Sequence, residues 1–384
     1  HWEAPDVDVR QAWAGPDGEF WGQTSTAVVR LLPRAESLVA EVILSARRIR
    51  DVAVEPLGAA WLATSEGLFR VAPLPWRHAP AFDHRSGPVL EITSDCRGQV
   101  VTATPRAVHW LDPDFQWRTS TLPGPAREDA PEAGGSLFPL PDGTLLVRTS
   151  DGGVILGADG TTQSPPASLA DTAPLGSLAD GRILLLSPRE GPVELVAYDG
   201  LRPMPFASLP EDTTRLGRLS FATQTRAGEL WVGGENGLAV RRGDTWTLVE
   251  PEPGQDPSAL ASLELPDGRL LIGGVDMLRE YDGRRWRALR RSLDRVHALH
   301  LSRDGTIWIA SGSGLMRFRE GSWFTFGEDE GLTAGPVFTV LEDGLGRLWA
   351  GTARGLYLFD AAADTDPPMA EIAGADVPER AGDA

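Results

Sequence analysis

One pattern occurs twice near the end of the chain, as VHALHLSRDGTIWIASGSGLMRF (residues 296–318) and as VFTVLEDGLGRLWAGTARGLYLF (residues 337–359). In each copy a Gly stands nine residues after the first Val, a Trp follows three residues later, and a second Gly follows six residues after the Trp. The two Trp residues, Trp308 and Trp349, are 41 residues apart. A fixed period of about 20 to 50 residues is typical of solenoids, propellers and other repeat folds, so this repeat decides the fold.

The first Gly of the pattern recurs along nearly the whole chain, at intervals of 37 to 47 residues. The nine positions are Gly18, Gly58, Gly98, Gly143, Gly181, Gly228, Gly268, Gly305 and Gly346. The Trp that follows is kept in five units, as Trp21, Trp61, Trp231, Trp308 and Trp349. Val or Leu replaces it in the other four units. Because only apolar residues replace it, we predict that this position packs in the core.

Each unit contains short apolar runs separated by turns that contain Gly. Pro266-Asp267-Gly268, for example, lies between two such runs. Asp-Gly in this setting is a strong hairpin signal, because Gly readily adopts the positive φ of a tight turn. Four antiparallel strands in every unit of about 40 residues are typical of a β-propeller blade. We therefore predict an all-β fold, a single closed β-propeller built from four-stranded blades.

The ninth unit lacks a fourth strand of its own, which raises the question of how the ring closes. The first residues, His1-Trp2-Glu3-Ala4-Pro5, resemble Trp76-Arg77-His78-Ala79-Pro80, which lies where a fourth strand is expected. We predict that the strand at Trp2 completes the last blade, which removes the open sheet edges. The prediction is a nine-bladed propeller over residues 1–360, followed by a linker or disordered tail over 361–384 that leads to a downstream domain. A seven- or eight-bladed ring, in which residues 134–209 form another structure, is the alternative.

Composition excludes several partners. The net charge is −18, which argues against nucleic acid or an anionic membrane surface as a partner. No apolar run is long enough to span a membrane, so we expect no membrane insertion in this region. The single Cys96 cannot form an internal disulfide.

Few motifs of catalytic chemistry are present. There is no P-loop and no GxSxG nucleophile motif, and we predict no cofactor, no bound metal and no catalytic residue. His297 and His300 have a suggestive spacing, but residues three apart on a strand point to opposite faces. The acidic run Glu328-Asp329-Glu330 lacks the ligand spacing of a calcium loop. Paired carboxylates on facing loops, as in glycosidases and lyases, stay open.

Ligands of propellers usually meet one mouth of the central channel. This mouth is built by the loops between second and third strands and by the segments that lead into first strands. An unusual number of Arg residues falls on these segments, which suggests an anionic or polyhydroxylated ligand held by bidentate hydrogen bonds. The candidate ligand-binding residues are Arg47, Arg48, Arg50, Arg106, Arg189, Arg215, Glu235, Arg295 and Arg354.

The repeat carries a family resemblance. LWVGGENGLAV (residues 230–240) and LWAGTARGLYLF (residues 348–359) resemble the two-component-regulator propeller repeat, which forms the extracytoplasmic sensor regions of bacterial hybrid histidine kinases and some diguanylate cyclases. DTDPPMAEI (residues 364–372) is similar to the start of the β-sandwich domain that commonly follows such propellers. Members of this family often carry two seven-bladed propellers in tandem, a pattern from which nine units depart.

The resemblance implies a non-catalytic sensor in the periplasm, tethered to the membrane through other segments of a receptor that could be a homodimer. Its ligand is expected to be a small molecule, either a carbohydrate or an anion. Two other classes of function remain open at this point. One is a propeller enzyme such as a polysaccharide or lactone lyase, and the other is a scaffold for protein-protein interaction.

Overall fold

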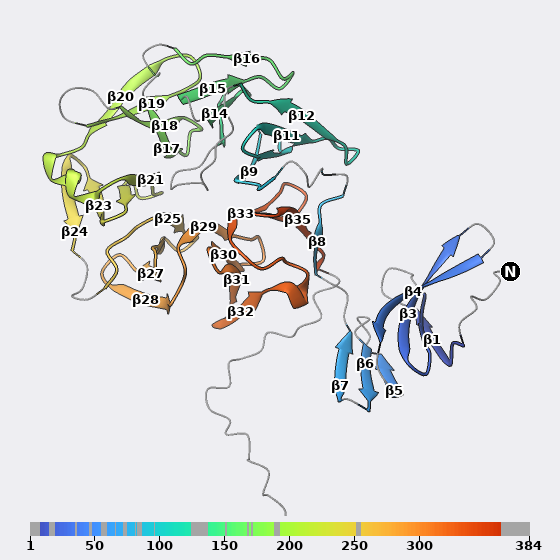
Figure 1. Ribbon diagram of the computed structural model, residues 1–384. Coiled ribbons are helices and arrows are strands. Elements are labelled where there is room, and N and C mark those ends of the chain that lie inside the picture. The colour runs from blue at the N-terminus through green and yellow to red at the C-terminus, as the bar shows by residue number, and fades with distance from the viewer. Residues whose placement is uncertain are drawn as a thin grey trace, which may run out of the picture. The chain divides into compact units, whose positions relative to one another are not determined.

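The computed structural model describes residues 8–14, 20–34, 37–45, 48–54, 60–65, 67–71, 75–80, 82, 87–95, 97–123, 137–149, 152–166, 169, 172–187, 193–250 and 255–361. Contacts within the chain define two compact units, and the boundary between them falls at Arg77 and His78. Figure 1 shows the strands of the larger unit arranged as a ring of blades. Among the described residues, no helix is long and apolar enough to cross a membrane.

Seven four-stranded antiparallel sheets can be counted in the described part of the chain from β8 onward. The first three are β9 (Glu91–Ser94), β10 (Val100–Ala103), β11 (Ala107–Leu111) and β12 (Trp117–Thr121); β13 (Leu137–Pro139), β14 (Leu145–Thr149), β15 (Gly152–Leu156) and β16 (Thr162–Gln163); and β17 (Ala173–Ser177), β18 (Ile183–Ser187), β19 (Glu194–Tyr198) and β20 (Pro203–Ser208). The next three are β21 (Leu219–Gln224), β22 (Leu230–Gly234), β23 (Gly237–Arg242) and β24 (Thr245–Val249); β25 (Ala261–Glu264), β26 (Leu270–Gly273), β27 (Met277–Tyr281) and β28 (Trp286–Arg291); and β29 (Val296–Leu301), β30 (Ile307–Ser311), β31 (Gly314–Arg319) and β32 (Ser322–Phe326). The last is β33 (Val337–Glu342), β34 (Leu348–Thr352) and β35 (Gly355–Phe359) with β8 (Trp76–His78). Two short 3₁₀ helices, η3 (Glu211–Leu216) and η4 (Glu328–Glu330), precede β21 and β33.

The ring is closed by β8 and not by the strand predicted at Trp2. β8 lies beside β35 as the outer strand of the last sheet, and the N–H of Ala79 donates to the carbonyl oxygen of Leu356 at 2.9 Å. The inner strand β33 also contacts β9, so the first and last blades are neighbours. Trp2 itself lies outside the described residues. The edge of β35 accepts one partner, and β8 fills that place, so the prediction of one nine-bladed ring over residues 1–360 was wrong.

The weak middle repeats do form blades. The described residues of segment 134–209 contain the sheets β13–β16 and β17–β20, so this segment does not form another structure, although the seven sheets agree with the number of blades in the seven-bladed alternative. A Leu replaces the recurring Trp in both sheets, and Leu146 and Leu184 are buried. An apolar side chain of smaller size at this position is therefore sufficient for the blade to form.

The smaller unit contains two further sheets. One has four strands, β1 (Gln11–Ala14), β2 (Phe20–Gln23), β3 (Ala27–Arg34) and β4 (Ser37–Ser45). The other has three among the described residues, β5 (Ile49–Val54), β6 (Ala60–Thr64) and β7 (Leu68–Val71). Val28 of the first sheet packs with Val52 and Leu62 of the second in the core of the smaller unit. These two sheets hold most of the first two repeat units, whereas the predicted fourth strand of the second unit is β8, which belongs to the last sheet. The predicted tail over 361–384 lies outside the described residues, apart from residue 361.

The recurring Trp is a core residue in the ring, as predicted. Trp231, Trp308 and Trp349 are buried, and each indole N–H donates to a polar side chain near the preceding turn. In the last blade the acceptor is the Asp343 carboxylate, which also accepts from Arg347 Nε at 2.6 Å and is almost fully buried. Burial by itself raises the pKa of Asp343, but the hydrogen bonds from Trp349 and Arg347 outweigh it and lower the pKa.

Ring closure by β8 predicts different effects of two Trp substitutions. Trp76→Ala removes a fully buried side chain from the closing strand, and we expect it to destabilise the ring by about 3 to 5 kcal/mol. Trp2→Ala should leave the melting temperature of the ring unchanged, because β8 already occupies the fourth position. Differential scanning calorimetry of both variants measures this. A larger loss for Trp2→Ala than for Trp76→Ala would contradict the described closure.

The buried carboxylate of Asp343 predicts a dependence of stability on pH. Its pKa in the folded protein lies below its ordinary value of 3.8, so it stabilises the fold above that pH, and the stabilisation is lost as the pH falls through the lower, folded value. Asp343→Asn should therefore lower the free energy of unfolding at pH 7 by about 1.5 to 3 kcal/mol, and by less in stronger acid. Urea unfolding at several pH values measures the difference. A difference independent of pH would contradict the role of the charge.

Candidate functional site

A cavity of about 280 Å³ lies on the axis of the ring, where the inner strands of all seven sheets converge. The lining residues are Leu90 and Glu91 from the first blade, Phe138 from the second, Leu175 and Gly176 from the third, Ser220, Phe221 and Thr223 from the fourth, Leu260, Ala261 and Ser262 from the fifth, Arg295 to Leu299 from the sixth, and Phe338 and Thr339 from the last. Most of them stand at the start of an inner strand. The cavity therefore opens at the face where the chain passes into the inner strands.

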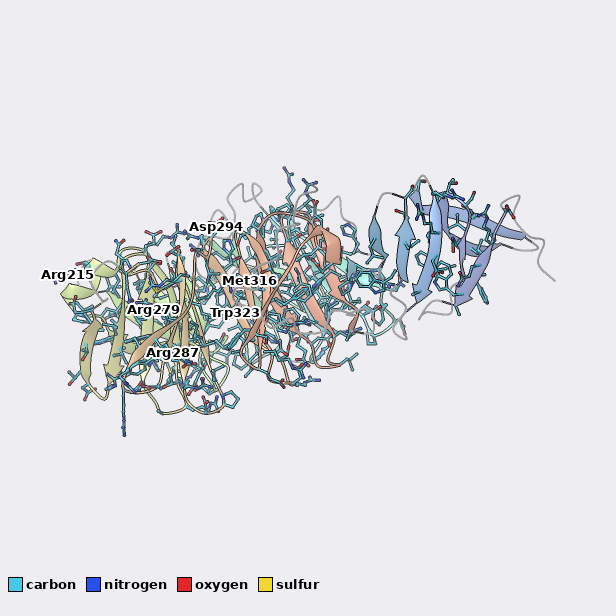
Figure 2. The ribbon with its side chains drawn as sticks, turned by 90° about the horizontal axis from the view of Figure 1, so that it is seen from below. Arg215, Arg279, Arg287, Asp294, Met316 and Trp323 are labelled. Atoms are coloured by element: carbon cyan, nitrogen blue, oxygen red, sulfur yellow. The ribbon has the colours of Figure 1, made fainter. Side chains whose placement is uncertain are left out.

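Figure 2 shows this face from the side. Asp294, which precedes Arg295, lies near the upper edge of the ring in this view, and Arg287, near the start of β28, lies toward the lower edge. The chain therefore rises through β28 and enters β29 at the upper face. The turns between second and third strands lie at the same face, because neighbouring strands are antiparallel.

A β-bulge recurs at the start of the inner strands. In β17, β21, β29 and β33 the pairing register skips one residue, and the skipped residues are Leu175, Ser220, His297 and Phe338. All four line the cavity. A bulge redirects the side chain of its extra residue, and bulges are frequent beside functional sites. The backbone irregularity thus repeats around the axis while the side chain that it presents changes from blade to blade.

Arg295 provides the one positive charge among the lining residues. Its φ is 47°, a left-handed conformation that few residues other than Gly adopt. Two hydrogen bonds hold this backbone: its N–H donates to the Val275 carbonyl at 2.7 Å, and its carbonyl accepts from the Gly312 N–H at 3.2 Å. The guanidinium has no hydrogen-bond or ion-pair partner in the part of the chain that the structure describes. A strained residue with an unpaired charge at a cavity is a candidate for function.

His297 lies beside this charge and is neutral at physiological pH. Burial, reinforced by the positive charge of Arg295 and partly opposed by Asp294, lowers the pKa of His297 to about 4. Its ring meets the ring of Phe338 edge-on, with 5.4 Å between the centroids. The imidazole can therefore donate one hydrogen bond and accept another without adding charge to the cavity.

The wall of the cavity also contains hydroxyl groups and an apolar region. The Ser220 hydroxyl is buried and has no hydrogen-bond partner among the described residues. Thr223 and Ser262 satisfy each other through a contact of 2.7 Å between their hydroxyl oxygens. The second and third blades, which lie across the axis from β29 in the order of the ring, contribute only Phe138, Leu175 and Gly176. The wall across the axis from Arg295 is thus apolar.

Of the nine residues predicted to bind a ligand, the structure brings Arg295 to the cavity. Four others are exposed at or near the same face without lining it: Arg106, Glu235 and Arg354 in turns between second and third strands, and Arg215 in η3. Arg48 and Arg50 are exposed in the smaller unit. Arg47 and Arg189 lie outside the described residues. A binding role for any of the nine stays a prediction.

Sequence reasoning missed the bulge residues, although the repeat contains a signal for them. The residues eight positions before the first Gly of five units are Leu90, Ser220, Leu260, His297 and Phe338. All five line the cavity. The position varies in polarity from unit to unit, which is the pattern of a ligand-facing site on a repeated scaffold. Arg50, a predicted site residue, occupies this position and a bulge in β5 of the smaller unit.

The chemistry of a metal site is not assembled in the described residues. They contain no group of three or more His, Cys, Asp and Glu side chains placed to hold an ion. His297 lines the cavity, whereas Nε2 of His300 accepts a hydrogen bond from the Glu342 N–H at 3.0 Å. The two histidines thus lie in different surroundings.

A second hollow, of about 490 Å³, lies where the turns of the fourth and fifth blades meet. Its acidic side chains are already paired. Glu229 accepts from Arg242 and Trp231, and Glu264 accepts from the N–H of Arg226. The contact between Arg226 and Glu264 joins the two blades, and together these pairs leave little unpaired polarity for a ligand, so we regard the axial cavity as the candidate site.

Comparisons with known proteins point to the fold. No protein-family model matches the chain, and no curated protein sequence is significantly similar to it. Among solved structures, an extracellular domain assigned to the hybrid two-component system BT3049 of B. thetaiotaomicron is 13% identical with a TM-score of 0.59, and the match covers 92% of this chain and 56% of that one. This chain thus spans about half the length of that receptor domain.

Lyases share the fold as well. A streptogramin B lyase is 15% identical with a TM-score of 0.55, over 74% of this chain and 97% of the lyase. A catalytically inactive His-to-Ala variant of virginiamycin B lyase from Staphylococcus aureus, solved with quinupristin, is 13% identical with a TM-score of 0.56, over 74% of this chain and 99% of that one. These likenesses confirm the propeller fold, and the receptor domain agrees with the resemblance of the repeat.

The environment of His297 predicts its titration. Because its pKa lies near 4, well below the ordinary value of 6.5, His297 should stay neutral from pH 8 down to about pH 5.5. The unfolded chain binds the proton more readily, so His297 favours folding above pH 6.5 and that contribution declines as the pH falls toward 4. NMR of the imidazole C–H signals, assigned with His297→Gln, measures the pKa. A midpoint near 6.5 would show that the ring is not buried in the cavity.

Proposed function

We propose that this chain is the ligand-sensing, extracytoplasmic part of a bacterial membrane-bound signalling receptor of histidine kinase or diguanylate cyclase type. The observation that carries the proposal is the axial cavity lined by Arg295, whose guanidinium has no partner among the described residues. The repeat resemblance and the fold shared with a receptor ectodomain support it. In this proposal the ligand occupies the channel, and residues 361–384 link the propeller to a downstream domain that leads to the membrane.

The geometry of the cavity supports binding more than turnover. A histidine whose pKa is about 4 is a weak general base near neutral pH, where efficient bases have a pKa closer to the working pH. In the described residues no carboxylate or carbonyl hydrogen-bonds to the His297 ring to fix its tautomer, as the partners of catalytic histidines commonly do. We therefore assign His297 a binding role and propose that the region is non-catalytic.

A lyase is the second candidate, and one observation favours it. The ring has the fold of streptogramin B lyase over nearly the whole lyase chain, and this chain carries a histidine in its channel. An inactivating His-to-Ala substitution is known in virginiamycin B lyase. If the present protein were such an enzyme, a compound that binds in the channel would be converted.

A ligand screen with product analysis distinguishes these functions. We expect at least one compound among oligosaccharides, uronic acids, amino acids and small organic acids to raise the melting temperature and to be recovered intact by mass spectrometry. Binding to the folded state alone adds about 2.7 kcal/mol of stability at a hundredfold excess over Kd. Conversion of the compound would support the lyase, and the lack of any shift would favour a protein-binding scaffold.

Two Arg variants locate the binding site of the compound found in this way. Arg295→Ala should abolish the thermal shift, because it removes the one cation of the cavity wall. Arg48→Ala is the matched control, since Arg48 is exposed in the smaller unit, and it should leave the shift intact. Loss of the shift with Arg48→Ala and retention with Arg295→Ala would move the site away from the channel.

A further inference from the structure

The axial cavity has the features of a binding site for a specific class of ligand. One wall is lined by Arg295, whose guanidinium has no partner among the described residues, and by the neutral imidazole of His297. A guanidinium offers parallel N–H donors that match the two oxygens of a carboxylate. The imidazole adds a donor without adding charge, so this wall is complementary to one carboxylate.

The opposite wall selects the rest of the ligand. Across the axis the blades present Phe138 and Leu175 with no polar side chain. The hydroxyl groups of a sugar placed against this surface would lose their hydrogen bonds to water without replacement, which is unfavourable. An aromatic or aliphatic body would instead bury apolar surface there. The cavity volume, about 280 Å³, is at the small end of the range for ligand sites and suits a molecule of one ring.

The charge balance of the cavity favours a monoanion. Among the lining residues Arg295 is the one cation and Glu91 the one carboxylate, with His297 neutral. Arg295 compensates one negative charge on the ligand, and no further cation lines the cavity to compensate a second. A dicarboxylate or a phosphate monoester is therefore a poorer match than a monocarboxylate.

We infer that the channel binds a small monocarboxylate with an apolar, one-ring body, the acid lying on Arg295 and the body against Phe138 and Leu175. This inference rests on the proposed sensing function and names the ligand class of that site. The strained backbone of Arg295 is consistent with it, since the neighbouring turns at Val275 and Gly312 hold the residue in a conformation that favours Gly or Asn.

Calorimetric titration of the whole chain tests the inference with phenylacetate, benzoate and indole-3-acetate. Phenylacetamide has the same shape without the charge, phenylmalonate carries a second carboxylate, and glucuronate carries a carboxylate on a polar body. We expect at least one of the three acids to bind, and its affinity to exceed that of each comparison compound by about tenfold or more. Failure of all three acids to bind below roughly 10 mM, or equal affinity for phenylacetate and phenylacetamide, overturns the inference.

The matched variants are Arg295→Asn and Arg291→Gln. Asn tolerates the left-handed backbone, so Arg295→Asn should keep the melting temperature while it weakens binding of the acid about tenfold to a hundredfold and removes the preference over phenylacetamide. Arg291 is exposed at the end of β28, near the same face, and does not line the cavity, so Arg291→Gln should bind as the unchanged chain does. Unchanged affinity in Arg295→Asn, or an equal loss in both variants, overturns the inference.

The two levels of the proposal fail in different ways. If glucuronate or a neutral sugar binds, is recovered intact and depends on Arg295, the sensor stands and the ligand class is wrong. If phenylacetate binds and is converted to a product, the ligand class stands and the sensing function is wrong.

Discussion

The pairing of β8 with β35 is the constraint on which the rest of the ring depends. It joins residues that are more than 270 positions apart in the sequence, and it places the first blade beside the last. Once the ring is closed, every inner strand has a neighbour on both sides and the axis becomes an enclosed channel. Contacts between blades maintain this spacing. Arg226 donates its backbone N–H to Glu264 of the next blade, and Arg303 repeats the contact with Glu342.

The repeat made the fold class predictable, because its turns and buried positions are local features. Gly305 and Gly346 have φ values of 84° and 80°, as the hairpin turns required. The number of blades was not predictable in the same way. Closure is a non-local pairing, and two segments of similar sequence, at Trp2 and at Trp76, were equally suited to it. Only the three-dimensional arrangement decides which of them meets β35.

The candidate site was predictable in part for a similar reason. Arg295 could be placed at the channel mouth because the repeat shows where an inner strand begins. The bulges at Ser220, His297 and Phe338 depend on hydrogen-bond register, which alternation of apolar residues does not reveal. We judged the direction of the His297 side chain from the two-residue alternation of a regular strand, and a bulge interrupts that alternation. The sequence also could not show that the Arg295 guanidinium lacks a partner among the described residues, because ion pairs and hydrogen bonds of side chains depend on neighbours from other blades.

The fold alone does not separate a sensor from a lyase, since both occur among the similar structures. A sensor and a lyase can differ in the side chain that each blade presents eight residues before the first Gly of its repeat unit. There the inner strand presents Leu90, Ser220, His297 or Phe338 to one common space, in the last three cases at a bulge, while the hydrogen-bonded sheet behind it stays the same. A substitution at this position changes the chemistry of the channel with little effect on the stability of the ring. Function in such a propeller therefore has to be argued from the side chains at the axis. Here these side chains combine the positive charge of Arg295 with an apolar wall.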